Sequence, residues 1–524
     1  MLNRKRIYYS TALAAVIARG IFAAVMIFSP FRFYHCLRGL DMQTLLRFAE
    51  WGKHADAVPF FTLHRILLHV NWLWNGETHQ VWTIFLIQTL LGIAGAVAVA
   101  DLVLMLCGKR RGALAGGIFF AIYLPVLVYE FQVLQETFYL NLTLLAYWST
   151  LKVWMKRFRW NWNIFCGALW AMALAGRPVA IFSALGCLIY FSWKKYRCKR
   201  PVHGISPAMI AFLLLLGVCC FNWSQNGSPM PFYSTNHIQH FNAGATADNG
   251  VVPATLFEVG IKALKRTPEL LSAFEVPENL NVYFFCDRHV LLNIFPGSTL
   301  LIPCTAAALV ILLGSGMWRK RYFLILFPVV FMALPLCARE VIGRYRLMLT
   351  PYFTVICVCG FYELKKITAP KRNILLIAAL VAGGMTFFIH TDLKKIRPED
   401  HHAWAEALIR TPGTEKKEIL EAFAEYYQSA GFNSEKAFKA TIDRALEYQD
   451  MDLVQTLLVQ GSIHGIDRNL LLYYQMWFFV LRNDPETVGK ISAKIDCNAL
   501  PEELQKQFLK VKQDTLQLLK RKTK

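Results

Sequence analysis

Two acidic residues beside apolar segments are the first candidates for chemistry. Asp41 begins the amphipathic part of "GLDMQTLLRFAEWG", a few residues after the first strongly apolar segment. Asp is a preferred helix N-cap, and its charge suits the positive end of the helix dipole. A capping carboxylate keeps one oxygen for proton transfer, so Asp41 is interpreted as a helix cap, a catalytic base, or both.

Glu136 lies in "YEFQVLQETFYLNL", where another apolar segment begins, and Glu130 lies in the same turn. Carboxylates within or beside membrane spans are costly and tend to face a polar cavity. Two interpretations remain open for Glu136: a solvated residue at the membrane interface, or part of a polar site.

Arginines supply the complementary charge. The segment "REVIGRYRLMLTPYF" places Arg339, Arg344, Arg346 and Tyr345 just before a late apolar segment. Arginine binds phosphate oxygens bidentately and stays charged at any working pH. This cluster is interpreted as a phosphate clamp or as a contact to lipid head groups.

Two further arginines interrupt apolar sequence. Arg19 lies in the middle of the first apolar segment, so it is expected to need a buried partner or a polar cavity. Arg177 in "GALWAMALAGRPVAIF" precedes Pro178. It is interpreted as an arginine that snorkels from a span end or as a further substrate contact.

The segment "STNHIQHFNAGATADNG" has the composition of a shaped loop, and His237, His240, Asn242 and Asp248 could line a polar site there. His237 and His240 have metal-ligand spacing on a helix, but the loop composition argues against a helix. No cofactor is firmly implied, and a divalent metal is the lesser alternative.

These residues must be positioned by membrane helices. The chain is 55% hydrophobic and only 17% charged, whereas soluble domains carry about 25% charge. Its apolar blocks of roughly 16 to 24 residues fit a bilayer. The sequence predicts a polytopic α-helical membrane protein with a retained first span and about eleven spans in all: 8–29, 81–106, 112–129, 135–155, 162–176, 178–193, 206–223, 298–318, 322–338, 346–363 and 373–390.

The net charge of +21 follows from topology rather than from nucleic-acid binding. Much of it lies in short loops such as "GKRR" and "KKYRCKR", which the positive-inside rule places in the cytoplasm. The N-terminus is then inside and the C-terminus outside. Arg339, Arg344 and Arg346 fall on the outer side, against this trend, which favours a functional role.

Three outer regions are too long to be simple connections: 31–80, 224–297 and the tail after about 390. In the first, "VPFFTLHRILLHVNWLW" has helical apolar spacing and is expected to lie in the membrane interface. The tail reads as amphipathic helices broken at Gly431 and Gly461. We expect a membrane domain over 1–390 and an extracytoplasmic α-helical domain over 391–524, either tetratricopeptide-like or simply a small helical domain that contacts a protein. Cys36 and Cys286 fall on the outer side, where a disulfide could form but cannot be established from sequence.

Several of these motifs occur in a known order. An outer loop opens D-x-x-x-L-x-x-x-A at Asp41, "QET" at 135–137 starts an early span, "GALWAMALAGRP" and "FNAGATADNG" follow, and "RYRLMLTPYF" precedes a late span. The pattern resembles the GT-C fold membrane glycosyltransferases, specifically the bacterial protein O-mannosyltransferase-like and aminoarabinose-transferase-like group. It covers roughly residues 1–390.

The resemblance implies an inverting transfer of a sugar from a polyprenyl phosphate to a protein, glycolipid or polysaccharide acceptor, outside the bacterial inner membrane. It implies Asp41 as catalytic base and Glu136 as the later acidic position. Arg344 and Arg346 correspond to basic residues near the lipid phosphate, with Tyr345, Arg177, His240 and Asn242 as further candidate contacts. The sequence departs from the pattern at Met42, where many members carry a second acid.

Other functions remain open. An envelope polysaccharide polymerase or ligase would place its key residues in the late outer loop and would need no acid after the first span. A lipid-linked-sugar flippase or transporter would favour broken helices at mid-membrane depth and similarity between halves. A non-catalytic scaffold would bind partners through the tail.

Overall fold

The architecture is taken from a computed structural model of the chain. The structure describes residues 3–37, 42–43, 46, 67–68, 70–71, 73–74, 81–155, 160–175, 179–198, 205–226, 261, 264–277, 280–316, 323–339, 343–389 and 395–522. Most of the predicted outer regions 31–80 and 224–297 lies outside these residues, and with them most of the predicted interfacial helix. The chain divides into two compact units, Met1–Lys395 and Ile396–Lys524.

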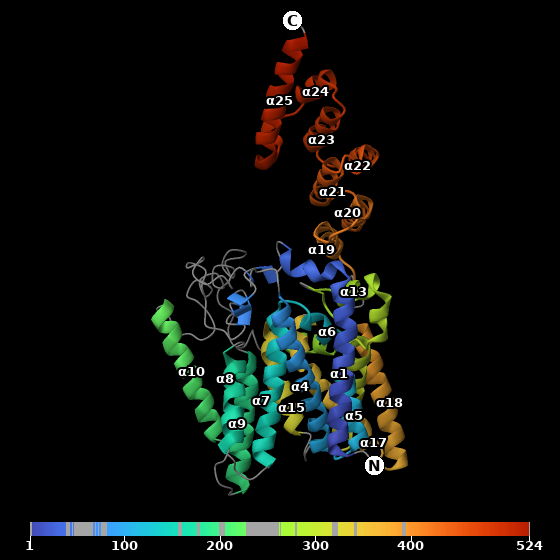
Figure 1. Ribbon diagram of the computed structural model, residues 1–524. Coiled ribbons are helices and arrows are strands. Elements are labelled where there is room, and N and C mark those ends of the chain that lie inside the picture. The colour runs from blue at the N-terminus through green and yellow to red at the C-terminus, as the bar shows by residue number, and fades with distance from the viewer. Residues whose placement is uncertain are drawn as a thin grey trace. The chain divides into compact units, whose positions relative to one another are not determined.

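The first unit consists of helices that run side by side (Figure 1). Its elements are α1 (Arg4–Ile27), η1 (Pro30–Cys36), α4 (Trp82–Cys107), α5 (Arg110–Ala121), α6 (Leu124–Glu130), α7 (Gln135–Met155), α8 (Trp160–Leu174), α9 (Val179–Cys198), α10 (Ile205–Asn226), η3 (Thr267–Leu271), α13 (Val282–Arg288), η4 (Val290–Ile294), α14 (Ser298–Gly314), α15 (Phe323–Arg339), α16 (Gly343–Arg346), η6 (Leu347–Leu349), α17 (Thr350–Leu364), α18 (Ala369–Met385) and η7 (Thr386–Phe388).

The apolar segments form helices, as their length and composition predict. Among the described residues, five helical segments are long and apolar enough to cross a membrane, or six if the bent α5–α6 pair is one span. Shorter apolar stretches lie within α9, α10 and α15. Each predicted span overlaps a helix of the described residues, but the count of eleven spans stays a prediction.

The predicted span 112–129 is not one straight helix. It is bent by 46° between α5 and α6. The break precedes Pro125, which has no backbone N–H and cannot continue the ladder of α5. The N–H of Leu124 instead donates to the carbonyl of Pro296, at 3.0 Å. The bend directs the short helix α6, and Glu130 at its end, toward the start of α7.

The helix α4 packs against α1, α5, α7 and α17, and less extensively against α6. Elsewhere α14 packs on α17 and α18, α8 packs on α7 and α10, and α15 packs on α9. Small residues allow the close approach of α17 and α14: a Cβ at Gly360 would lie 2.6 Å from the Cβ of Ala308. Such small-residue contacts are the usual means of helix association in lipid.

The segment that follows α1 is fixed against α13 by aromatic rings. Phe31 in η1 stacks on Phe285 with ring centroids 3.6 Å apart, and His289 lies 2.8 Å from the hydroxyl of Ser29. Burial lowers the pKa of His289. No disulfide joins Cys36 and Cys286 in the structure, so the disulfide considered from the sequence is not formed.

The second unit is a series of helices in which each packs on its neighbours in sequence. They are α19 (Pro398–Ile409), α20 (Lys416–Ala430), α21 (Glu435–Glu447), α22 (Met451–Ile463), α23 (Arg468–Leu481), α24 (Pro485–Ser492) and α25 (Glu502–Lys522). The starts of α20, α22 and α24 at 416, 451 and 485 are 35 and 34 residues apart. This spacing matches a tetratricopeptide period of about 34 residues, but membership of that repeat class stays a prediction.

The two glycines expected to break the tail helices behave differently. Gly431 ends α20 with a positive φ of 81°, as predicted. Gly461 does not break a helix, because α22 continues to Ile463 and the left-handed residue is Gly465. A Cβ at Gly461 would lie 2.9 Å from Leu471 and 3.0 Å from Phe438. This glycine therefore serves close packing between helices.

Candidate functional site

The first turn of α7 carries Glu136. A carboxylate there lies at the partial positive end of the helix dipole. The residue is only 2% exposed, so it has been taken out of water. An acidic side chain buried at a span end needs charged or hydrogen-bonding neighbours.

One such neighbour comes from the other half of the chain. The Nε of Arg344 in α16 lies 3.9 Å from the Oε1 of Glu136. This distance is an ion-pair contact rather than a direct hydrogen bond. The side chain of Arg344 is 12% exposed, so the guanidinium keeps some access to its surroundings. Two residues singled out in separate sequence motifs are thus brought together.

Tyr345 extends this contact. The guanidinium of Arg344 lies over the Tyr345 ring, 5.0 Å from its centroid, and donates a 3.3 Å hydrogen bond to the Tyr345 hydroxyl. A cation held against an aromatic face has a restricted orientation. The site therefore presents a fixed positive charge next to a buried carboxylate.

Arg346 has a different environment from Arg344. Its guanidinium donates a 2.6 Å hydrogen bond to the carbonyl of Ser272 and lies 3.8 Å from the carboxylate of Glu275. Burial raises the pKa of Glu275, and the charge of Arg346 opposes this rise. Arg346 therefore connects α16 to the segment around Glu275. Of the two arginines, Arg344 is the one that contacts Glu136.

The turn into α16 depends on close backbone contact with that same segment. The N–H of Gly343 donates to the carbonyl of Val276 at 3.1 Å, and a Cβ at position 343 would lie 3.2 Å from that oxygen. Burial raises the pKa of Tyr283 to about 12, and the negative charge of Glu275 contributes. The hydroxyl of Tyr283 accepts from the backbone N–H of Glu275 at 2.8 Å.

Several predicted site residues lie outside the described part of the chain. These are Asp41, Arg177, His237, His240, Asn242 and Asp248. Arg339 ends α15, but its side chain is not among those described. Within the described ranges no group of three His, Cys, Asp or Glu side chains could hold a metal ion.

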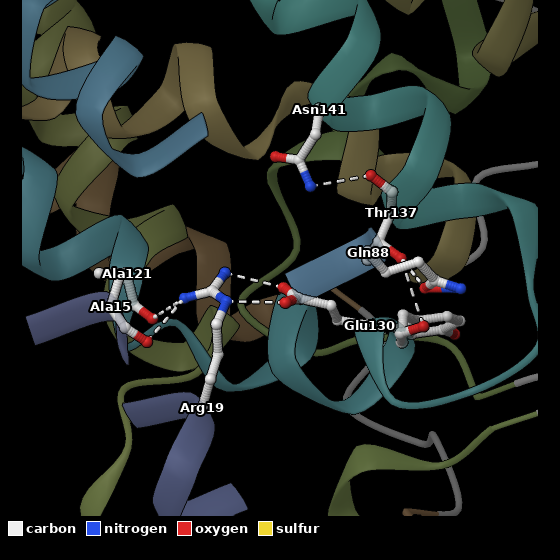
Figure 2. A network of polar contacts seen from close by, with 8 residues as sticks. Ala15, Arg19, Gln88, Ala121, Glu130, Thr137 and Asn141 are labelled. Atoms are coloured by element: carbon white, nitrogen blue, oxygen red, sulfur yellow. Dashed lines mark hydrogen bonds and ion pairs between the residues drawn. The ribbon is translucent and has the colours of Figure 1, made fainter. Parts of the chain in front are cut away.

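The sequence predicts a buried partner or a polar cavity for Arg19, and the structure shows that the buried partner is Glu130. Nε and NH2 of Arg19 each donate a 2.7 Å hydrogen bond to one oxygen of the Glu130 carboxylate (Figure 2). The third nitrogen donates to the carbonyls of Ala15 and Ala121 at 3.3 and 3.2 Å. Both side chains are buried, at 2% and 0% exposure. The pair joins α1 to the end of α6.

A second set of polar contacts holds the turn between α6 and α7. The amide of Gln88 in α4 donates to the carbonyl of Gln132 at 3.2 Å. Its oxygen accepts from the hydroxyl of Thr137 at 3.0 Å (Figure 2). The side chain of Gln132 reaches the carbonyl of Phe31 at 3.5 Å. The turn before Glu136 is thereby linked to α4 and to the segment that leads toward Asp41.

A third polar cluster was not identified from the sequence. Asp101, near the end of α4, is nearly fully buried and binds Arg4 at 2.7 Å and the indole N–H of Trp148 at 2.9 Å. It also contacts Lys152 and the hydroxyl of Tyr8. The signal was present, because Asp101 is an acidic residue inside an apolar segment. With four donors around one carboxylate, this cluster ties α1, α4 and α7 together.

The sequence of the early spans is similar to a known protein family. Residues 76–223 match the family described as dolichyl-phosphate-mannose-protein mannosyltransferase. The match includes "QET" at 135–137 and "GALWAMALAGRP", and it confirms the resemblance to GT-C membrane glycosyltransferases for this part of the chain. The apolar helices and the family match together indicate a multi-pass membrane protein.

Comparison with individual proteins adds one similar structure. The chain is similar to the archaeal oligosaccharyltransferase AglB from Archaeoglobus fulgidus, solved in complex with an inhibitory peptide and a dolichol-phosphate. The TM-score is 0.35 at 14% identity, over 81% of this chain and 60% of the archaeal one. The present chain thus spans about 60% of that protein's length, and no argument is built on a likeness of this degree. No curated protein matches the sequence significantly.

Proposed function

We propose that the protein is a membrane glycosyltransferase that moves a sugar from a polyprenyl-phosphate donor to an extracytoplasmic acceptor. The observation that carries the proposal is the contact between Arg344 and Glu136, 3.9 Å apart. It joins the acidic motif, inside the region that matches the mannosyltransferase family, to the arginine motif outside it. A fixed cation beside a buried carboxylate suits the stabilisation of a phosphate leaving group.

In the proposed reaction the acceptor hydroxyl or amine attacks the anomeric carbon as the bond to the phosphate oxygen breaks. Asp41 takes the acceptor proton, and Arg344 stabilises the departing polyprenyl phosphate. A single displacement inverts the anomeric centre. Glu136 orients the guanidinium of Arg344 through their ion-pair contact, and Tyr345 restricts it from the other side.

The remaining candidate contacts keep subsidiary roles. Arg346 contacts Ser272 and Glu275, and these contacts hold α16 against the segment around Glu275. Arg177, His240 and Asn242 are proposed as contacts to the sugar or the acceptor. The reaction as written needs no metal ion, although a divalent cation bound by the carboxylates would serve the same phosphate.

The decisive test uses membranes that contain the protein, a radiolabelled polyprenyl-phosphate sugar and a mixture of peptide, glycolipid and polysaccharide acceptors. The expected result is label transferred to one acceptor class by the wild type and lost in Arg344→Ala. A flippase would move the labelled lipid between leaflets without any transfer, which would contradict the proposal. Treatment with EDTA followed by Mg²⁺ or Mn²⁺ decides whether a divalent cation takes part.

Location and orientation form part of the same proposal. We propose a bacterial inner-membrane protein with the N-terminus in the cytoplasm and residues 391–524 outside it, where the helical tail would contact a protein partner. Alkaline phosphatase fused after Lys524 is active only outside the cytoplasm. Activity of this fusion is expected, and an inactive fusion that is stably produced would reverse the orientation.

A further inference from the structure

The start of α7 is held by one polar side chain from the middle of the bundle. Gln88 is 1% exposed and lies in the second turn of α4, a mostly apolar helix whose other buried polar residue is Asp101. Both functional groups of its amide are used. The nitrogen donates to the carbonyl of Gln132, and the oxygen accepts from the hydroxyl of Thr137 (Figure 2). Gln132 precedes Glu136 in the turn, and Thr137 follows it directly. One side chain therefore contacts the chain on both sides of Glu136, at the backbone of Gln132 and at the side chain of Thr137.

The same face of α4 is shaped to receive this region. Gly92 and Gly95 follow Gln88 at i+4 and i+7, which places the three residues on one side of the helix. A Cβ at Gly92 would lie 2.3 Å from the Arg19 guanidinium and 2.5 Å from the Glu130 carboxylate. A Cβ at Gly95 would lie 2.3 Å from the side-chain oxygen of Asn141. A larger residue at either position would displace the side-chain groups that lie against this face.

The energetic contribution of these bonds to stability is small. Hydrogen bonds between membrane helices add little net stability, because the separated helices also find partners. Apolar side chains would pack α4 against α7 without the cost of burying an amide. The geometric effect is larger, because an amide that donates to one residue and accepts from another defines both their distance and their orientation.

We propose that Gln88 is a positioning residue for Glu136. Through Gln132 and Thr137 it sets the position of the Glu136 carboxylate relative to Arg344, while the Arg19–Glu130 pair holds the end of α6. This inference rests on the proposed function, in which Glu136 orients the arginine that meets the phosphate. A displacement of about 1 Å at such a site lowers the rate by up to about a hundredfold.

The test compares near-isosteric variants of the full-length protein in the donor-transfer assay. Thr137→Val removes the hydroxyl that donates to Gln88 and keeps the side-chain shape, whereas Thr137→Ser keeps the hydroxyl. Gln88→Met removes both hydrogen bonds at similar volume. We expect Thr137→Val and Gln88→Met to lower kcat by between about ten- and a hundredfold, with KM for the lipid donor unchanged and melting temperatures within a few degrees of the wild type.

The matched variants make the outcome clear. Thr137→Ser is expected to retain kcat within about twofold. Gln88→Met with Thr137→Val is expected to lose less than the product of the two single losses, because both changes remove the contact between Gln88 and Thr137, although Thr137 also donates to the carbonyl of Tyr129. Unchanged kcat in Thr137→Val and Gln88→Met would overturn the inference. So would a fall in melting temperature that parallels the fall in kcat, since the role would then be structural.

Glu136→Gln in the same assay distinguishes a failure of the role proposed for Glu136 from a failure of the positioning role proposed for Gln88. If Glu136→Gln transfers sugar normally, the assignment of Glu136 in the proposed function fails, whatever Gln88 does. If Glu136→Gln is slow while Gln88→Met and Thr137→Val are normal, only the positioning role of Gln88 fails.

Discussion

The carboxylate of Glu136 and the guanidinium of Arg344 lie 3.9 Å apart, although they come from opposite halves of the chain. One residue starts α7 and the other lies in the four-residue helix α16, just before α17. Neither position is fixed by local sequence alone. The contact depends on the turn between α6 and α7 on one side and on the segment around Glu275 on the other.

This contact predicts unequal effects of its two members. Arg344→Ala should lower kcat by about 10²–10³, because it removes the charge that stabilises the leaving phosphate. Glu136→Gln should have a smaller effect, because Glu136 acts through the arginine. The double variant should be no slower than Arg344→Ala alone. Transfer of labelled sugar measures all three, with Arg111→Ala, which removes an exposed arginine in the first turn of α5, as the control. Fully additive losses would show that the two residues act independently.

The proposed base predicts a substitution that separates capping from catalysis. Asn caps helices about as well as Asp but cannot accept a proton at neutral pH. Asp41→Asn should therefore lower kcat by about 10²–10⁴ without loss of protein from the membrane. Normal transfer by Asp41→Asn at wild-type protein levels would leave Asp41 as a cap only.

The buried pair between Arg19 and Glu130 predicts a stability effect. Removal of one partner leaves an uncompensated buried charge, which costs about 3–5 kcal/mol. Arg19→Met and Glu130→Leu should each lower the melting temperature in detergent strongly. The double variant should recover much of this loss, because no buried charge remains. A double variant less stable than both single variants would contradict this account of the pair.

The raised pKa of Glu275 predicts a pH dependence. Its pKa lies above the ordinary value of 4.5, mainly because the residue is buried. The folded protein therefore favours the protonated carboxyl, and this contribution to stability is fully present below about pH 4.5 and is lost as the pH rises through the raised pKa. Glu275→Gln keeps a neutral side chain at every pH. The melting temperature of the wild type should fall relative to Glu275→Gln as the pH rises from 4.5, and parallel curves would refute the prediction.

The helices of the bundle could be predicted from the sequence because each apolar segment is long enough to cross a bilayer. The bend between α5 and α6 was missed, although Pro125 gave a local signal. It was not recognised because apolar composition alone does not distinguish a straight span from a broken one.

The sequence could predict that a buried polar residue needs a partner, but not which residue that partner is. The expectation that Arg19 needs a buried partner follows from its position in an apolar segment, and Glu130 supplies that partner. The choice of Glu130 depends on how α1 packs against α6, which no local pattern contains. The difference between Arg344 and Arg346 has the same origin, since it depends on Glu275, a residue outside every recognised motif.

Arg19 and Glu130 are 111 positions apart in the sequence, which has a consequence for biosynthesis. The helix α1 leaves the ribosome long before α6 is made, and an arginine at the centre of a lone helix costs about 2.5–3.5 kcal/mol to insert. Until α6 has been synthesised, Arg19 therefore lacks its buried ion-pair partner. The packing of α1 in the bundle is in this way completed only after the synthesis of α6.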